Sequence, residues 1–137
     1  MYLLDTNVVS ERSKLHPDEK VMAWLSAHTV GQTYLSVITL AELEQGVLRL
    51  GDTKRARELQ LFLRGIEEQF TGHILPVDWA VARAWASMTA DAISAGKTLG
   101  YADSLIAATA RTHGLIVVTR NVADFQAVMS DVVNPWE

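Results

Sequence analysis

Residues 1–7 read MYLLDTN and residues 115–121 read LIVVTRN, so that in each stretch a short apolar run ends at polar side chains. Runs of this kind, at Tyr2–Leu4 and Leu115–Val118, are typical of buried strands. In open α/β sheets, ligands bind outside the carboxyl ends of the strands, which is where Asp5 falls. The two stretches therefore predict two buried strands, and they place the carboxylate of Asp5 at the edge of the sheet where ligands bind.

Further strands and helices are predicted around these two stretches. Apolar segments predict strands at 33–37, 74–77 and 132–133, and helical spacing of apolar residues predicts helices over 17–28, 40–50, 52–70, 78–92 and 101–113. Asp78 is expected to cap the fourth of these helices, and Gly114 to end the last one. Short strands that alternate with helices indicate α/β construction around a mainly parallel sheet covered on both faces.

The composition is that of a globular protein. The chain has 137 residues, 49% of them hydrophobic, with three prolines and eight glycines, so we expect a single domain over residues 1–137. No apolar run approaches the roughly 20 residues that span a bilayer. Residues 1–7 lack the basic region and cleavage site of a signal peptide, and there is no cysteine. We expect a soluble, cytoplasmic protein with no membrane partner.

The net charge of −4 argues against a nucleic-acid partner, because neutralising phosphates requires lysine and arginine. A divalent cation bound by carboxylates can invert the local charge and make an acidic protein compatible with a phosphodiester. Glu42 and Asp103 are candidates, since neither has a basic residue at a helical neighbour position. Helical periodicity does not choose between Glu42 and Glu44 as the residue of the site. Asp124 could cap a turn as well as bind a metal ion.

Other kinds of site are less well supported. The four histidines, His16, His28, His73 and His113, have no metal-ligand spacing, so a zinc site is not expected. There is no GxSxG turn for a serine nucleophile. The AGKT stretch at 95–98 lacks the earlier glycine of a phosphate-binding loop and is predicted to be an ordinary loop.

The whole pattern resembles the PIN-domain nucleases, and most closely the toxin subunits of the VapBC type. The motifs are LLDTN at 3–7, TLAEL at 39–43, GYADSLIAATA at 100–110 and VTRNVADF at 118–125, while VVNPWE at 132–137 is similar to the FitB-like branch. The resemblance covers nearly the full length. It implies a three-layer α/β/α sandwich with a central, mainly parallel sheet of about five strands, usually as a homodimer.

The resemblance also implies the residues of the site. The acidic pocket would consist of Asp5, Glu42, Asp103 and Asp124, all as metal ligands and catalytic residues, with Thr6, Asn7, Thr119 and Asn121 as supporting polar groups. The match selects Glu42 over Glu44. Some family members place another aspartate near Asn121, so this chain is expected to bind a second metal more weakly.

The implied activity is that of a metal-dependent endoribonuclease, the toxin of a toxin–antitoxin pair, whose antitoxin blocks the site. Oxygen-only ligands suit Mg²⁺, with Mn²⁺ as a substitute. Arg12, Lys14 and Lys97 are candidates for a basic rim that steers RNA.

Several alternatives stay open at this point. A stand-alone PIN-type RNA-processing nuclease and a catalytically silent PIN-like module that binds metal or RNA share the same motifs. A phosphatase of the haloacid-dehalogenase type would need a second aspartate where this chain has Asn7. A response-regulator receiver would need an acidic pair near the first strand, and that pair is missing.

Overall fold

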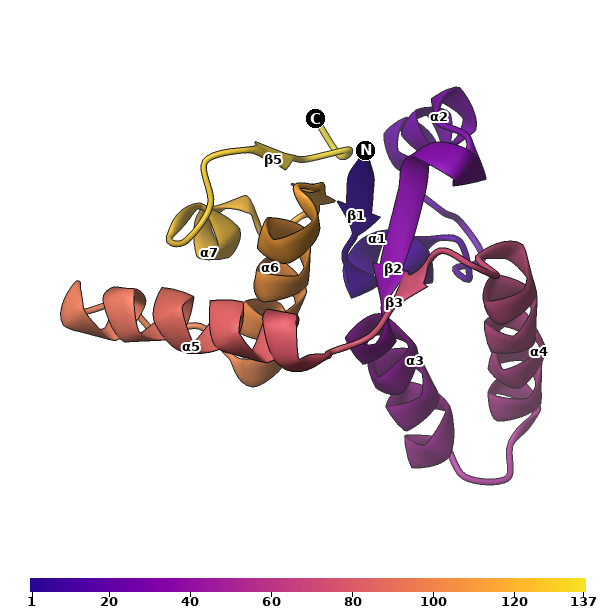
Figure 1. Cartoon of the computed structure of the whole chain (residues 1–137). Helices are drawn as coiled ribbons and strands as arrows, with labels where there is room; N and C mark the ends of the chain where they lie inside the picture. Colours follow the sequence, from indigo (N-terminus) through magenta and orange to yellow (C-terminus); the bar gives the residue numbers. More distant parts are fainter.

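The computed structural model describes all residues, 1–137, and is built around one parallel sheet (Figure 1). Its five strands lie in the order β3-β2-β1-β4-β5, and every neighbouring pair is parallel. Their bounds are β1 (Tyr2–Leu4), β2 (Thr33–Ser36), β3 (Ile74–Leu75), β4 (Ile116–Val118) and β5 (Val132–Val133). The predicted fold class is confirmed, and the strand order, which the sequence left open, places β1 at the centre.

Helices cover both faces of this sheet. They are α1 (Thr6–Glu11), α2 (Glu19–Ala27), α3 (Val37–Arg49), α4 (Lys54–Gln69), α5 (Trp79–Ser94), α6 (Tyr101–His113) and α7 (Val122–Gln126), with a 3₁₀ turn at Val30–Gln32. In Figure 1, α1, α2 and α4 lie on one side of the strands, while α5, α6 and α7 lie on the other. None of the helices is both long and apolar enough to cross a membrane.

Two hydrophobic cores result, because successive residues of a strand point to opposite faces. Leu3 and Val117 belong to the core beneath α5, α6 and α7, whereas Leu4 and Val118 belong to the core beneath α1, α2 and α4. All four of these side chains are fully or almost fully buried. A strand buried on both faces explains why these segments read as continuous apolar runs rather than as alternating ones.

Capping side chains set several helix boundaries that periodicity places only approximately. Asp18 accepts hydrogen bonds from the backbone N–H groups of Lys20 (2.8 Å) and Val21 (3.2 Å), so the helix predicted over 17–28 begins at Glu19 and leaves Pro17 outside. Ser36 caps α3, which therefore begins before the predicted position 40. The predictions that Asp78 caps α5 and that Gly114 ends α6 are confirmed, Gly114 with a left-handed φ of 65°.

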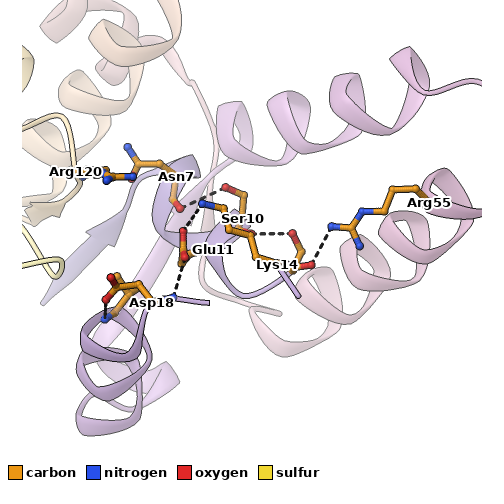
Figure 2. Close-up of polar contacts among 9 residues, drawn as sticks. Asn7, Ser10, Glu11, Lys14, Asp18, Arg55 and Arg120 are labelled. Atoms are coloured by element: carbon orange, nitrogen blue, oxygen red, sulfur yellow. Dashed lines mark hydrogen bonds and ion pairs between the residues drawn. The ribbon is translucent and has the colours of Figure 1, made fainter. Parts of the chain in front are cut away.

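The loop between α1 and α2 is fixed by a buried carboxylate (Figure 2). Glu11, only 4% exposed, accepts a hydrogen bond from the Asp18 backbone N–H at 2.9 Å and forms an ion pair with Lys14 at 2.7 Å. The bond from Lys14 lowers the pKa of Glu11. Arg55 on α4 donates to the Ser13 carbonyl at 2.9 Å and ties the same loop to the next layer.

Two of the residues predicted for a basic rim have partners within this part of the protein. Lys14 pairs with Glu11, as described above. Arg12 donates from Nη1 to Gln69 Oε1 at 2.9 Å, and burial lowers the pKa of its guanidinium. The charge of Lys14 is thus paired within the protein, whereas Arg12 makes a single hydrogen bond to a neutral amide and no ion pair.

Candidate functional site

Asp5 lies where the central strand ends and α1 begins. Its backbone N–H continues the sheet by donating to the Val118 carbonyl at 2.9 Å, and its Oδ1 accepts from the Thr6 backbone N–H at 2.8 Å. The side chain is therefore held at the carboxyl edge of the sheet, at the start of a helix. Asp5 is only 3% exposed.

Burial of Asp5 has an electrostatic consequence. It raises the pKa of this carboxyl group from 3.8 to about 6, because the charged form loses its solvation. Hydrogen bonds from Thr119 and Thr6 act in the opposite direction, and the charges of Asp103 and Glu42 raise the pKa further. No basic group contributes to the pKa of Asp5, so its charge is uncompensated within the protein.

Two of the predicted supporting residues contact the other Asp5 oxygen, and a third joins them through Thr119. The Thr119 hydroxyl donates to Asp5 Oδ2 at 2.7 Å, and Asn7 Nδ2 lies 3.3 Å from the same oxygen and 3.2 Å from Thr119 Oγ1. Asn121 joins through its backbone N–H, which donates to Thr119 Oγ1 at 3.0 Å. Its side chain is exposed and makes no hydrogen bond with this group. The network thus joins the ends of β1 and β4.

Glu42 reaches the same place from α3. It is half-buried, and its Oε1 accepts a hydrogen bond from the Thr6 hydroxyl at 2.5 Å. Thr6 Oγ1 is also 3.2 Å from Oγ1 of Thr39, a fully buried residue one helical turn before Glu42. Glu44 is exposed on the same helix and takes no part in these contacts. Tertiary position therefore separates the two glutamates, which helical periodicity could not.

Thr39 is a residue of this network that the sequence analysis did not single out. It lies in the TLAEL stretch, three positions before Glu42, which places the two on one face of a helix. A hydroxyl at that spacing from a buried carboxylate is a usable signal once Glu42 has been chosen. Helical periodicity alone does not choose between Glu42 and Glu44, so the residue pattern without the family resemblance does not point to Thr39.

Asp103 and Asp124 complete the acidic surface from α6 and α7. Asp103 is half-buried in the first turn of α6, and its pKa is raised by burial and by the charges of Glu42 and Asp124. Asp124 is exposed on α7. The structure thus brings all four predicted carboxylates within electrostatic range of at least one other member, as a chain from Asp5 through Asp103 to Asp124 with Glu42 beside it.

The donor set fits a hard divalent cation in its chemistry. All of the candidate ligands are oxygens, and mutual repulsion between the carboxylates favours a bound positive charge. No group of three or more His, Asp or Glu side chains lies close enough together to hold an ion by itself.

A comparison with protein-family models matches residues 2–128 to the model described as PIN domain. The chain belongs to the PIN domain family. The resemblance carried by the four motifs is thus confirmed. All four candidate carboxylates lie within the matched range of the PIN domain, which ends before β5.

Two relatives of this PIN domain share more than two fifths of its residues. It is 43% identical to the VapC ribonuclease Y4jK of Sinorhizobium fredii, over 100% of this chain and 99% of that protein. It is 44% identical to toxin FitB of Neisseria gonorrhoeae, over 99% of both.

Solved structures agree with the architecture of the PIN domain. The crystal structure of FitAcB from Neisseria gonorrhoeae superposes with a TM-score of 0.93 at 44% identity, covering 99% of both chains. VapBC-5 from Mycobacterium tuberculosis, a member of the VapBC family of toxin-antitoxin systems, superposes with a TM-score of 0.71 at 26% identity, covering 96% of this chain and 97% of that one.

Proposed function

We propose that this chain is a Mg²⁺-dependent endoribonuclease that hydrolyses RNA phosphodiester bonds and acts as the toxin of a toxin–antitoxin pair. The observation that carries the proposal is the buried, uncompensated carboxylate of Asp5 at the carboxyl edge of the sheet, next to Glu42 and Asp103. Its relatives in the family are described as a ribonuclease and as a toxin.

Each side chain has a defined part in this proposal. Asp5 and Asp103 would hold the ion directly, Glu42 would hold it directly or through water, and Asp124 would complete a second, weaker position. When bound, such an ion lowers the pKa of a water molecule and stabilises negative charge on a phosphate. Thr119 and Asn7 fix the orientation of Asp5, and Thr6 fixes that of Glu42. These hydrogen bonds keep both carboxylates aimed at the site.

Cleavage of single-stranded RNA by the purified chain tests the metal requirement. We expect cleavage with Mg²⁺ or Mn²⁺, and a fall to background when a chelator is added in excess. Restoring Mg²⁺ to the chelated sample should restore the activity, which controls for denaturation. Equal cleavage with and without chelator would contradict the metal mechanism, and no cleavage under any condition would favour a silent PIN-like binding module.

The two glutamates of α3 provide a matched pair for a further prediction. Glu42→Gln removes the charge but keeps an oxygen that can accept from Thr6, so the fold should be retained while cleavage falls by roughly 100-fold. Glu44→Gln makes the same chemical change at an exposed position and should leave cleavage unchanged. Initial rates at saturating Mg²⁺ check both variants. Equal losses in the two would contradict the assignment of Glu42.

A partner is proposed from the family and from a hollow near the site. Between α3 and α4 lies a hollow of about 270 Å³ whose walls include Leu43, Val47 and Phe62 and which reaches Glu42. An amphipathic helix of an antitoxin would fit such a groove, and a basic side chain at its end would use the carboxylates' need for a cation. A short neighbouring reading frame for a DNA-binding protein would support the toxin role, and its absence would favour a stand-alone RNA-processing nuclease.

A homodimer is proposed from an apolar surface at the α5–α6 junction. Ile93 and Tyr101, which are 67% and 76% exposed, lie there around an apolar hollow of about 200 Å³.

Lys97 is proposed as an RNA contact, as the basic rim predicted from the sequence requires. It shares an open hollow with Asp124 but forms no ion pair. We also propose a cytoplasmic location, which a chain without cysteine fits.

A further inference from the structure

Arg120 is attached to the carboxylate network through its backbone. It follows Thr119 directly, and its N–H donates to Asn7 Oδ1 at 3.4 Å, while the amide nitrogen of Asn7 donates to Asp5 Oδ2 at 3.3 Å. In Figure 2, Arg120 lies beside Asn7 and away from the contacts that Lys14 and Arg55 make with the α1–α2 loop. The main chain of Arg120 is therefore fixed two hydrogen bonds from Asp5.

The side chain of Arg120 is exposed but rests on an aromatic ring. Its guanidinium carbon lies 5.3 Å from the centre of the Trp136 ring, within the range of a cation–π contact. Trp136 is half-buried, packs against the core beneath α1, α2 and α4, and is fixed by a hydrogen bond from its backbone N–H to Asn134 Oδ1 at 2.9 Å. The ring thus holds the guanidinium in place at the rim of the site.

The positive charge of Arg120 is not used inside the protein. The three ion pairs of the chain join Lys14 to Glu11, Arg55 to Glu58 and Arg57 to Asp52, and none involves Arg120. The only hydrogen bond of Arg120 with the site is made by its backbone N–H. The guanidinium is therefore free to bind an anion from outside.

We propose that Arg120, held on the ring of Trp136, binds a backbone phosphate of the RNA strand beside the bond that is cleaved. This inference rests on the proposed ribonuclease function and adds a substrate-binding residue to it. A guanidinium binds phosphate through two parallel hydrogen bonds, and one that is already oriented loses less conformational entropy on binding. Arg120 also places a positive charge at the edge of an otherwise acidic surface.

Binding and cleavage by an Arg120→Gln variant test the proposal. Binding of a fluorescent 12-nucleotide single-stranded RNA is measured by anisotropy in chelator, so that no metal-dependent cleavage occurs, over a series of KCl concentrations. We expect Arg120→Gln to bind about 5- to 10-fold more weakly and to show a salt slope reduced by about 0.7, the value for one lost contact to a single strand. In Mg²⁺, KM should rise with little change in kcat, since the contact is made before and during cleavage.

Arg83 provides the matched control. Its guanidinium lies 5.8 Å from the centre of the Trp79 ring on α5, so it is another exposed arginine resting on a tryptophan, but no hydrogen bond connects it to the carboxylates. Arg83→Gln should bind and cleave as the wild type does. Trp136→Leu, with its folding checked by thermal unfolding, should weaken binding by about half as much in log affinity as Arg120→Gln, because the guanidinium is present but unrestrained.

The outcomes separate this inference from the function on which it rests. If the wild type binds and cleaves RNA while Arg120→Gln has the same affinity, salt slope and KM, the assignment of Arg120 is wrong and the function stands. Equal losses in Arg120→Gln and Arg83→Gln would show only a general effect of charge and would also overturn it. If the wild type neither binds nor cleaves RNA, both the inference and the proposed function fail.

Discussion

Asp5→Asn is expected to abolish RNA cleavage, lowering kcat/KM by about 1,000-fold or more, while the fold is retained. The change removes the most buried charge of the site, and with it a ligand for the metal. Metal catalysis contributes several kcal/mol of stabilisation to the transition state, and about 4 kcal/mol corresponds to 1,000-fold. The amide is nearly the same size as the carboxylate, so steric disruption is small. Single-turnover cleavage at saturating Mg²⁺ measures the loss.

Although Asp5→Asn should lose activity, its free energy of unfolding should rise. The pKa of Asp5 is raised from 3.8 to about 6, so the folded protein binds this proton more tightly than the unfolded chain does. Stability from this group is therefore fully present below about pH 4 and is lost as the pH rises through about 6, by up to about 3 kcal/mol. After about 1 kcal/mol is subtracted for weakened hydrogen bonds, metal-free Asp5→Asn should be about 2 kcal/mol more stable than the wild type at pH 7.

Denaturant unfolding at pH 4 and pH 7 measures this difference, and Asp78→Asn is its control. Asp78 also caps a helix, accepting from the Val81 backbone N–H at 3.0 Å, but it is exposed and shares no hydrogen bond with the four carboxylates. Asp78→Asn should neither lose activity nor gain stability at pH 7. Full cleavage by Asp5→Asn would refute the site. Lower stability of Asp5→Asn than of the wild type at pH 7 would contradict the uncompensated burial of Asp5.

The largest effect on stability is expected from Phe125→Ala, at about 3–5 kcal/mol. Phe125 on α7 is fully buried and belongs to the core beneath α5, α6 and α7. Replacing its ring with a methyl group removes apolar surface and leaves a cavity, and both effects lower the free energy of unfolding. Urea unfolding monitored by tryptophan fluorescence measures the change.

Leu61→Ala on α4 is the control for Phe125→Ala. It also shortens an apolar side chain, but Leu61 is 68% exposed, so its free energy of unfolding should change by less than about 0.5 kcal/mol. Phe125 also anchors α7, the helix that carries Asp124, to this core. Loss of this anchor should therefore reduce cleavage more than the fall in folded fraction explains. A change under 1 kcal/mol in Phe125→Ala would contradict its role in the core.

Much of the fold follows from local pattern, and the misplaced boundaries have local causes. The helix over Tyr101–His113 was predicted with its observed ends, because alanine-rich helical spacing is closed by Gly114 in the left-handed conformation that a helix end favours. The start of α3 was predicted at residue 40 rather than Val37, since Ser36 caps the helix while the apolar residues before 40 also suit a strand. The capping residue and the apolar spacing then indicate different starts for the helix, and the sequence does not show which of the two is correct.

By itself, the sequence determined that the protein is an α/β molecule with Asp5 at the end of a buried strand, because a charge that closes an apolar run is a local feature of the chain. It also carried the motifs that identify the PIN domain family. Only the tertiary structure decided that β1 lies at the centre of the sheet, that Glu42 rather than Glu44 meets Thr6, and that Arg120 rests on Trp136 beside Asn7. These facts depend on contacts between segments distant in sequence, and those contacts form only when the strands pair and the helices pack against them.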